Sequence, residues 1–272
     1  MAGSLSDKVI VVTGSTRGIG RAIAEACADA GATVVLSSRT AGAVRDAVSA
    51  FETCGRCCSG IAADVASAQD VQALYDHALA THGRIDAWVS NAGISLGYRP
   101  LDELSVSEID DIVGINLLGS LYAMRLLVPY FREHGGQLLN MSGRGYRGEA
   151  TPHTAAYAAT KTAIASITKS VAEENEDCDR ISVNALVPGM VLTDFYVDMK
   201  TSPRLVSTVG NWRLAMDAFG VPLETVGLEA VRVLSIPPGR ETGRIYSLLR
   251  GTRLARGIAL MSWYGMSGKM KK

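Results

Sequence analysis

Short apolar runs rich in β-branched residues alternate along the chain with stretches whose apolar positions recur every three or four residues. The first run, KVIVVT at Lys8 to Thr13, predicts a parallel strand that is buried on both faces. Further strands are predicted by the same pattern at 33–38, 59–63, 85–90, 137–141, 181–187 and 243–249. Helical spacing predicts helices at 41–53, up to 82, at 109–133 and from 157 to about 176. At 272 residues, this order is typical of one α/β domain.

A glycine-rich turn directly follows the first predicted strand. In TGSTRGIGRAIAEACADAG the glycines are Gly14, Gly18 and Gly20, and a helical pattern continues from there to Gly31. Glycines at a strand-to-helix turn let backbone N–H groups and the helix N-terminus approach a pyrophosphate, whose charge the helix dipole favours. The position of the turn therefore predicts a dinucleotide site.

Tyr157 and Lys161 form the second chemical feature. They lie four residues apart in AAYAATKTAIAS, so on a helix both side chains leave by the same face. An adjacent ammonium favours the phenolate, and bringing the tyrosine pKa from near 10 toward 7 requires about 4 kcal/mol. A half-buried helix with a packed tyrosine and a solvated lysine would show the same spacing. Because the glycine turn predicts a dinucleotide site, we interpret Tyr157 as a proton donor.

The spacing TGxxxGIG together with YxxxK resembles the short-chain dehydrogenase/reductase family over about residues 6 to 250. The resemblance implies a single doubly wound Rossmann-type α/β domain, with a seven-stranded parallel sheet flanked by helices and a cofactor outside the carboxyl ends of the strands. We expect this domain at 1–250, with a substrate lid at about 194–222. A C-terminal extension at 251–272 is expected to pack on the domain or on a partner subunit.

The end of the second predicted strand indicates which nicotinamide cofactor binds. An acidic residue there would hydrogen-bond the ribose of NAD, but this chain has Ser38 followed by Arg39. A hydroxyl and a guanidinium accept the 2′-phosphate of NADP, and Arg17 can approach it from the glycine turn. We therefore expect NADP(H). The alternative is that both arginines are solvated surface charges.

The resemblance also implies a wider set of cofactor contacts. Asp64 and Val65 would lie against the adenine, although Asp64 could instead cap the next helix through Ser67. The Asn-Ala-Gly turn at 91–93 would approach the ribose, and an ordinary turn has the same composition. The expected cofactor-binding residues are Gly14, Ser15, Thr16, Arg17, Gly18, Ile19, Gly20, Ser38, Arg39, Asp64, Val65, Asn91, Ala92, Gly93, Tyr157, Lys161, Pro188, Gly189, Val191 and Thr193.

The expected catalytic residues are Tyr157, Lys161 and Asn116, with Ser142 as a further candidate if the register of its strand slips. Asn116 is expected to be part of a proton relay rather than a satisfied core amide. The chain departs from the family at its serine, because the usual Asn-Ile-Ser-Ser reads Asn-Met-Ser-Gly at 140–143. Glycine thus takes the catalytic place, and Ser142 is expected on the other face of the strand unless the register slips. Replacement donors are Arg144, Tyr146, a backbone N–H of the Gly-Arg-Gly turn, or Ser95.

Two later segments bear on partners. The expected lid carries bulky apolar residues, including Phe195, Tyr196 and Trp212, which indicates a hydrophobic, cyclic or aromatic carbonyl substrate unless these residues only pack. The tail from 252 to 272 mixes apolar and basic residues. Dimer packing or cover over a neighbour's pocket is favoured for it, with an amphipathic membrane anchor as the alternative.

Composition limits the remaining classes of partner. The 27 basic and 27 acidic side chains leave no net field for nucleic acid, and no apolar run reaches the length of a membrane span. Five cysteines without a second CxxC indicate free thiols and no metal site. A cytoplasmic location is expected by default.

These features predict an NADP(H)-dependent oxidoreductase, a ketoreductase or secondary alcohol dehydrogenase, with Tyr157 as general acid/base and a homodimer or homotetramer as its assembly. A non-catalytic NADP-binding regulatory protein is the alternative from another class. A redox-neutral epimerase or isomerase at the same site is the enzymatic alternative.

Overall fold

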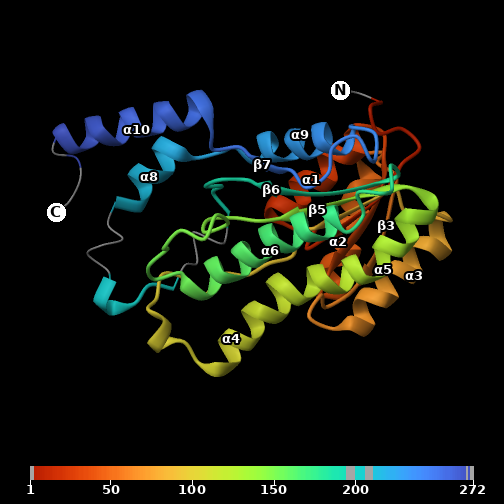
Figure 1. Cartoon of the computed structure of the whole chain (residues 1–272), viewed down its shortest axis with the longest axis horizontal. Coiled ribbons are helices and arrows are strands. Elements are labelled where there is room, and N and C mark those ends of the chain that lie inside the picture. The colour runs from red at the N-terminus through yellow and green to blue at the C-terminus, as the bar shows by residue number, and fades with distance from the viewer. Residues whose placement is uncertain (1–2, 194–199, 206–210, 268, 270–272) are drawn as a thin grey trace.

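The structure is a computed structural model that describes residues 3–193, 200–205, 211–267 and 269. Its centre is a parallel sheet of seven strands in the order β3-β2-β1-β4-β5-β6-β7, which confirms the expected doubly wound fold (Figure 1). The strands are β1 Val9–Thr13, β2 Thr33–Ser38, β3 Cys58–Ala62, β4 Ala87–Ser90, β5 Gly136–Met141, β6 Ile181–Val187 and β7 Ile245–Ser247.

Helices cover both faces of this sheet. The described helices are α1 Gly18–Asp29, α2 Ala41–Thr53, α3 Ala68–His82, α4 Val106–Val113, α5 Gly119–His134, α6 Ala155–Glu173, α8 Trp212–Phe219, α9 Leu223–Leu234 and α10 Gly251–Met266. Alternate side chains of β1 point to opposite faces, so Ile10 packs with α1, α2 and α9 while Val11 packs with α3, α5 and α6. Such a strand must be apolar at every position, as the sequence pattern indicated.

The long helix expected at 109–133 extends over 106–134 and contains a π-helical turn, η2, at Gly114–Leu118. Its mean hydropathy of 1.5 and its length would suit a membrane span, yet half of the apolar window is buried inside the domain. It therefore serves as a core helix. The strand ends differ from expectation by a few residues, chiefly in the shorter β4 and β7.

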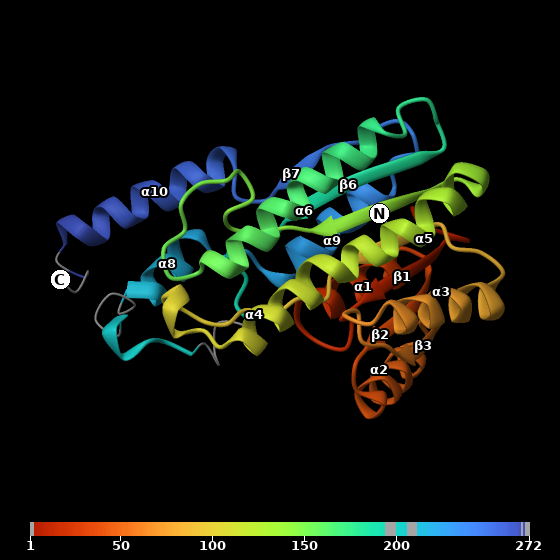
Figure 2. The same ribbon diagram turned by 60° about the horizontal axis from the view of Figure 1, so that its bottom comes forward.

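The order of the strands places the site. The chain moves from β1 outward to β2 and β3, then returns across β1 to β4, so the loops after β1 and β4 diverge at one point of the sheet edge. A crevice opens at such a switch point, outside the carboxyl ends of the strands. At one end of the molecule, α8 and α10 lie beside each other and apart from the sheet (Figures 1 and 2).

Candidate active site

The glycine turn after β1 is packed directly on the Asn-Ala-Gly turn after β4. The Thr13 hydroxyl accepts hydrogen bonds from the N–H groups of Asn91 (3.0 Å) and Ala92 (3.1 Å), and the Asn91 amide donates to the Thr13 carbonyl at 2.9 Å. Gly14 has a φ of 64°, and a Cβ on it would lie 2.9 Å from the Ala92 Cα. A Cβ on Gly20 would overlap the Gly14 carbonyl and the Asn91 amide. These glycines are therefore required by the contact between the two turns.

Ser15 is held by the neighbouring strand β2. It is fully buried, its N–H donates to the Ser37 carbonyl at 3.0 Å, and its hydroxyl accepts from the Ser37 N–H at 2.9 Å. The N–H and the hydroxyl of Ser15 are therefore both bonded to β2. These bonds hold the glycine turn on the sheet, and the expected cofactor contact of Ser15 stays a prediction.

The glycine of the second turn brings two predicted catalytic residues together. A Cβ on Gly93 would lie 3.2 Å from Asn116 Oδ1 and 3.7 Å from Lys161 Nζ. Any larger side chain would crowd both groups. The absence of a side chain at 93 thus lets the end of β4, the π-helical turn and α6 meet at one place.

Asn116 is held by the protein rather than exposed to the pocket. Its Oδ1 accepts from the Ile94 N–H at 2.8 Å, and its Nδ2 donates to the Ile94 carbonyl at 3.0 Å and to Thr160 Oγ1 at 3.3 Å. Thr160 in turn donates to the Tyr157 carbonyl at 2.7 Å. Asn116 lies within η2, so the expected helix distortion is present, and its side chain ties that turn to the helix bearing Tyr157.

Lys161 is the buried charge of the site. It is 5% exposed, and its Nζ donates to the Met141 carbonyl at the end of β5, at 3.0 Å. Burial lowers the pKa of this ammonium from its usual 10.5 to about 8, because desolvation disfavours the charged form. Nζ also lies 5.5 Å from the centroid of the Tyr157 ring. The tyrosine and lysine therefore share one face of α6, as the spacing predicts.

Gly143 lies beneath the phenol of Tyr157. A Cβ on Gly143 would be 2.5 Å from Tyr157 Oη and 3.4 Å from Lys161 Cγ. Residue 143 is thus the one that faces the Tyr157 hydroxyl. Ser142 is buried, and its hydroxyl donates to the Lys161 carbonyl at 2.9 Å. That hydroxyl packs β5 on α6, in agreement with the strand register expected from the sequence.

A cavity of about 470 Å³ lies along the sheet edge, lined by the two turns and by Tyr157 and Lys161. The glycine turn, the end of β2 and Asp64 form one end of it, and Tyr157, Lys161 and Met141 form the other. Of the residues expected from the sequence, those that line the cavity are Gly14, Thr16, Arg17, Gly18, Ile19, Gly20, Ser38, Arg39, Asp64, Val65, Asn91, Ala92, Gly93, Ser142, Tyr157, Lys161, Pro188 and Thr193. Besides Ser15, three expected residues lie outside the lining: Asn116, Gly189 and Val191.

The packing of Val191 and Gly189 explains why these two residues lie outside the cavity lining. The Val191 side chain is 2% exposed and belongs to the core between the sheet and α9. Gly189 has a φ of 79° and faces Val221 and Leu249, so it shapes the turn after β6. Asp64 stays in the lining while its Oδ1 accepts from the Ala66 N–H at 3.0 Å. The cap of α3 is Ser67, whose hydroxyl accepts from the Asp70 N–H.

A wall that the sequence did not reveal closes the far side of the cavity. Tyr98 pairs with Thr201 in an isolated parallel bridge, with the Tyr98 N–H donating to the Lys200 carbonyl at 2.8 Å. The Arg99 N–H donates to the His153 carbonyl at 2.8 Å. The segments after β4, β5 and β6 are therefore joined there. Lid residues 194–199 and 206–210, including Phe195 and Tyr196, lie outside the described residues.

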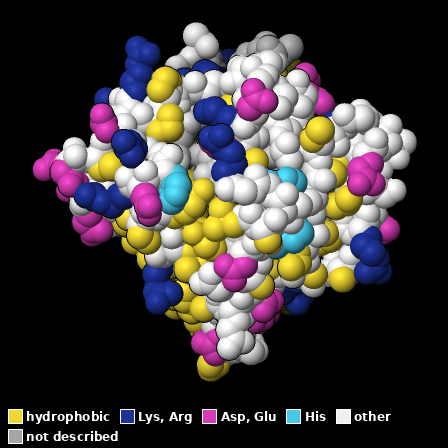
Figure 3. Space-filling model, turned by 90° about the vertical axis from the view of Figure 1, so that its right-hand side faces the viewer, with side chains coloured by type: hydrophobic (Ala, Val, Ile, Leu, Met, Phe, Trp, Pro, Cys, Tyr) yellow, Lys and Arg dark blue, Asp and Glu magenta, His cyan; other side chains and the backbone are white. Residues whose placement is uncertain are grey.

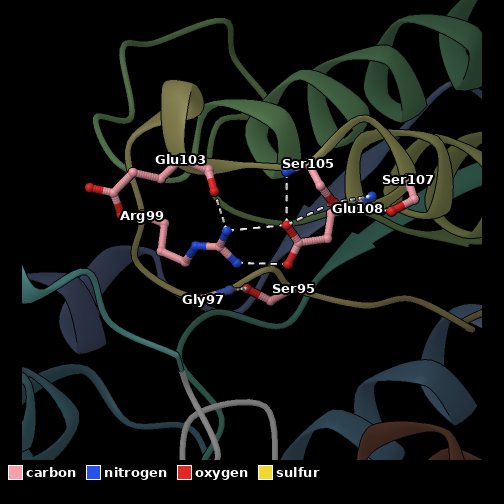
Figure 4. A network of polar contacts seen from close by, with 7 residues as sticks. All are labelled: Ser95, Gly97, Arg99, Glu103, Ser105, Ser107 and Glu108. Atoms are coloured by element: carbon pink, nitrogen blue, oxygen red, sulfur yellow. Dashed lines mark hydrogen bonds and ion pairs between the residues drawn. The ribbon is translucent and has the colours of Figure 1, made fainter.

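An ion pair fixes the base of this wall (Figure 4). The Arg99 guanidinium binds both oxygens of Glu108 at 2.7 and 3.1 Å and also contacts the Glu103 carbonyl. Glu108 additionally accepts from the Ser105 N–H at 2.9 Å in a capping box that begins α4. Arg99, then the Ser105 N–H, lower the pKa of Glu108 to about 2. The Ser-x-x-Glu spacing of the capping box is visible in the sequence, but no sequence pattern indicates that Arg99 pairs with Glu108.

The buried lysine generates a prediction about stability and pH. Its pKa is lower in the folded than in the unfolded chain, so the folded state binds fewer protons between about pH 8 and 10.5, and the free energy of unfolding rises with pH in that window. Below it, the charged ammonium costs about 3 kcal/mol. We expect Lys161→Met to raise the free energy of unfolding at pH 7 by about 2 kcal/mol, since losing the Met141 hydrogen bond offsets about 1.

Urea unfolding of the cofactor-free protein at pH 7 and near pH 10 measures this effect. The gain from Lys161→Met should shrink at the higher pH, because the wild-type lysine is then neutral. Lys169→Met, on an exposed position of the same helix, is the matched control and should show no such change. A gain that is equal at both pH values would contradict a buried titrating lysine.

Known proteins resemble this chain over the same region. A profile of the short chain dehydrogenase family matches residues 8–203. The chloroplastic chlorophyll(ide) b reductase NOL of Oryza sativa subsp. japonica is 36% identical over 200 residues, which cover 71% of this chain and 58% of that protein. The 3beta-hydroxysteroid dehydrogenase 1 of Eggerthella lenta is 34% identical over 206 residues, 75% of this chain and 78% of the relative. This chain thus spans little more than half of the reductase NOL.

A solved structure agrees with the sequence matches. The crystal structure of 3-ketoacyl-(acyl-carrier-protein) reductase from Brucella melitensis complexed with NADH has a TM-score of 0.79 and 27% identity, covering 90% of this chain and 97% of that chain. Since the family profile spans the glycine turn, the Tyr-Lys helix and most of the sheet, this chain belongs to the short-chain dehydrogenase family of oxidoreductases that use a nicotinamide cofactor.

Proposed function

We propose that this protein is an NADP(H)-dependent reductase of hydrophobic ketones, which also oxidises the matching secondary alcohols. The observation that carries the proposal is the position of Tyr157 Oη above Gly143, beside the buried Lys161, in the cavity that contains the glycine turn. A phenol next to an ammonium, at one end of a dinucleotide-sized cavity, is the arrangement that proton transfer to a carbonyl oxygen requires.

The residues of the cavity fit a nicotinamide dinucleotide. Gly14, Gly18 and Gly20 line the cavity, and α1 begins at Gly18 with no acidic residue in its first turn, so its N-terminus can face a pyrophosphate. When bound, the cofactor supplies the hydride or accepts it. Lys161 is placed to favour the tyrosinate, and Tyr157 donates its proton to the substrate oxygen in reduction and takes it back in oxidation.

The preference for NADP(H) rests on the end of β2. Ser38 and Arg39 line the cavity there together with Arg17, and no carboxylate occupies the position after β2. Two guanidinium groups suit the 2′-phosphate, whereas a carboxylate would repel it. The reductase from Brucella melitensis was crystallised with NADH, so its structure does not favour NADP(H). The proposed preference for NADP(H) therefore rests on the two arginines of this chain.

The wall around the catalytic end supports an apolar substrate. Ile94, Leu96, Ile115 and Met141 line the cavity near Tyr157. Gly143 lets Tyr157 Oη occupy the position that a side chain at 143 would fill, so this hydroxyl can face the apolar end of the cavity. The names of two relatives specify cyclic substrates, a chlorophyll(ide) and a steroid, which agrees with this class.

The activity test is NADPH oxidation with a panel of cyclic and aromatic ketones, followed at the nicotinamide absorbance. We expect Tyr157→Phe to lower turnover by about 10²- to 10⁴-fold while NADPH affinity is retained, because only the hydroxyl is lost. Tyr122→Phe, at a half-buried tyrosine of α5 outside the cavity lining, is the control and should keep turnover within about threefold. Wild-type turnover in Tyr157→Phe would refute the proposed acid, and NADPH binding without any turnover would favour a regulatory protein.

Cofactor choice has its own test. NADPH should bind at least about tenfold more tightly than NADH, and Arg39→Ala should remove most of that difference, because a charge-assisted hydrogen bond to phosphate is lost. Arg45→Ala, an exposed arginine on α2, is the control and should leave both affinities unchanged. Fluorescence titration of the two cofactors measures the ratio. Equal affinities in the unmodified protein would end the NADP assignment.

Residues 142 and 143 can be separated by mutation. Gly143→Ala places a methyl group against Tyr157 Oη, so we expect kcat/KM to fall by about 10- to 100-fold. Ser142→Ala should keep turnover within about threefold and lower the free energy of unfolding by about 1 kcal/mol, the value of its hydrogen bond to the Lys161 carbonyl. A hundredfold loss in Ser142→Ala, with folding and NADPH affinity intact, would identify Ser142 as a catalytic donor instead.

A further inference from the structure

The last helix, α10, has a second apolar side that the domain does not cover. Its packed side rests on α8, where Gly257 lies against Phe219 and the Tyr264 hydroxyl bonds Asp217. Elsewhere on the helix, Leu254, Ile258, Trp263 and Met266 are 38 to 81% exposed. They are four of the eight exposed large hydrophobic side chains in the described part of the chain, so one helix carries half of these side chains.

The spacing of these residues makes a continuous surface. Leu254, Ile258 and Met266 are separated by four and eight residues, and the exposed positions between them include the small residues Ala255, Ala259 and Ser262 and one charged residue, Arg256. No acidic side chain interrupts the helix. A surface helix normally turns charged residues to water, so a helix that is apolar on both sides requires a second partner.

The charge around α10 indicates what that partner is. From Thr242 to Lys272 the sequence holds seven Lys and Arg and no Asp or Glu, although the whole chain has 27 of each sign. At the opposite end of the molecule, side chains of both signs are interspersed (Figure 3). Arg250 precedes α10, Arg256 is exposed on it, and Lys269 follows it with Nζ 4.4 Å from the Trp263 ring centroid. Cations therefore border the apolar surface.

We propose that α10 docks this protein on a membrane surface rich in anionic phospholipid. The exposed apolar residues would enter the boundary between headgroups and acyl chains, with the bordering Arg and Lys at the level of the phosphates. Two copies of α10 facing each other would instead bring two basic segments together, which like-charge repulsion opposes. The helix lies at one end of the molecule with α8, apart from the sheet, so it can lie on a surface while the domain remains in water (Figures 1 and 2).

Vesicle co-sedimentation of the full chain tests the proposal. We expect binding to vesicles of phosphatidylcholine with about one third phosphatidylglycerol, little binding to phosphatidylcholine alone, and release as salt is raised. Ile258→Glu should lower the bound fraction at least about tenfold, and Arg256→Glu should lower it less. Val106→Glu, at another exposed apolar position on α4, is the matched control and should bind like the wild type.

Three results would overturn the proposal: equal binding by wild type and Ile258→Glu, equal binding to both vesicle types, or no binding at all. The wild type could fail to bind vesicles and form an oligomer that Ile258→Glu dissociates, as measured by sedimentation velocity. In that case α10 is an interface between copies of the chain. Far-UV circular dichroism and thermal melting check that the variants fold. If Ile258→Glu does not fold, Ile258→Ser replaces it. NADPH oxidation in solution is a separate readout, so failure of the proposed reductase activity would leave this test intact.

Discussion

The burial of the Lys161 ammonium is the constraint on which the rest of the site depends. A charge removed from water is tolerated only where oxygen atoms replace its solvation, and here the Met141 carbonyl does so from the end of β5. Ser142 fixes the backbone of α6 at Lys161 from the same strand. Gly93 leaves the volume that the ammonium and Asn116 need. Each neighbouring residue type is thus explained by one buried cation and its environment.

The two turns at the switch point divide their polar groups between protein and ligand. Thr13, Ser15 and Asn91 direct their side chains at neighbouring backbone, so the turns are rigid before any cofactor binds. What remains open at this edge is the cavity beside the two turns, with the N-terminus of α1 at its lining. A rigid and preformed cradle loses little conformational entropy on binding, which is the physical advantage of this arrangement.

The two ends of the cavity differ in polarity. Arginines lie at the end of β2, while Ile94, Leu96 and Met141 lie near Tyr157, so a ligand with one charged and one apolar end is oriented by the walls.

The charge of the chain is unevenly distributed along the sequence. Residues 242–272 are basic, and residues 1–241 carry a net negative charge. A neutral total charge therefore conceals a strongly polarised molecule, and arguments from net charge alone miss it.

The sequence by itself determined the fold, the glycine turn and the Tyr157–Lys161 pair, because alternation along strands and four-residue spacing on helices are local geometry. The resemblance to the family's Asn-Ile-Ser-Ser also indicated that Gly143 takes the place of the serine, and the alternation of side chains along a strand indicated that Ser142 points to the other face. Only the tertiary structure decided that Ser15 bonds to β2, that Arg99 pairs with Glu108 beside the cavity, and that Tyr98 joins the segment after β6. Which side of α10 is covered was likewise decided by α8. These contacts are made between side chains or segments whose meeting depends on how separate elements pack, and no local spacing in the sequence specifies that packing.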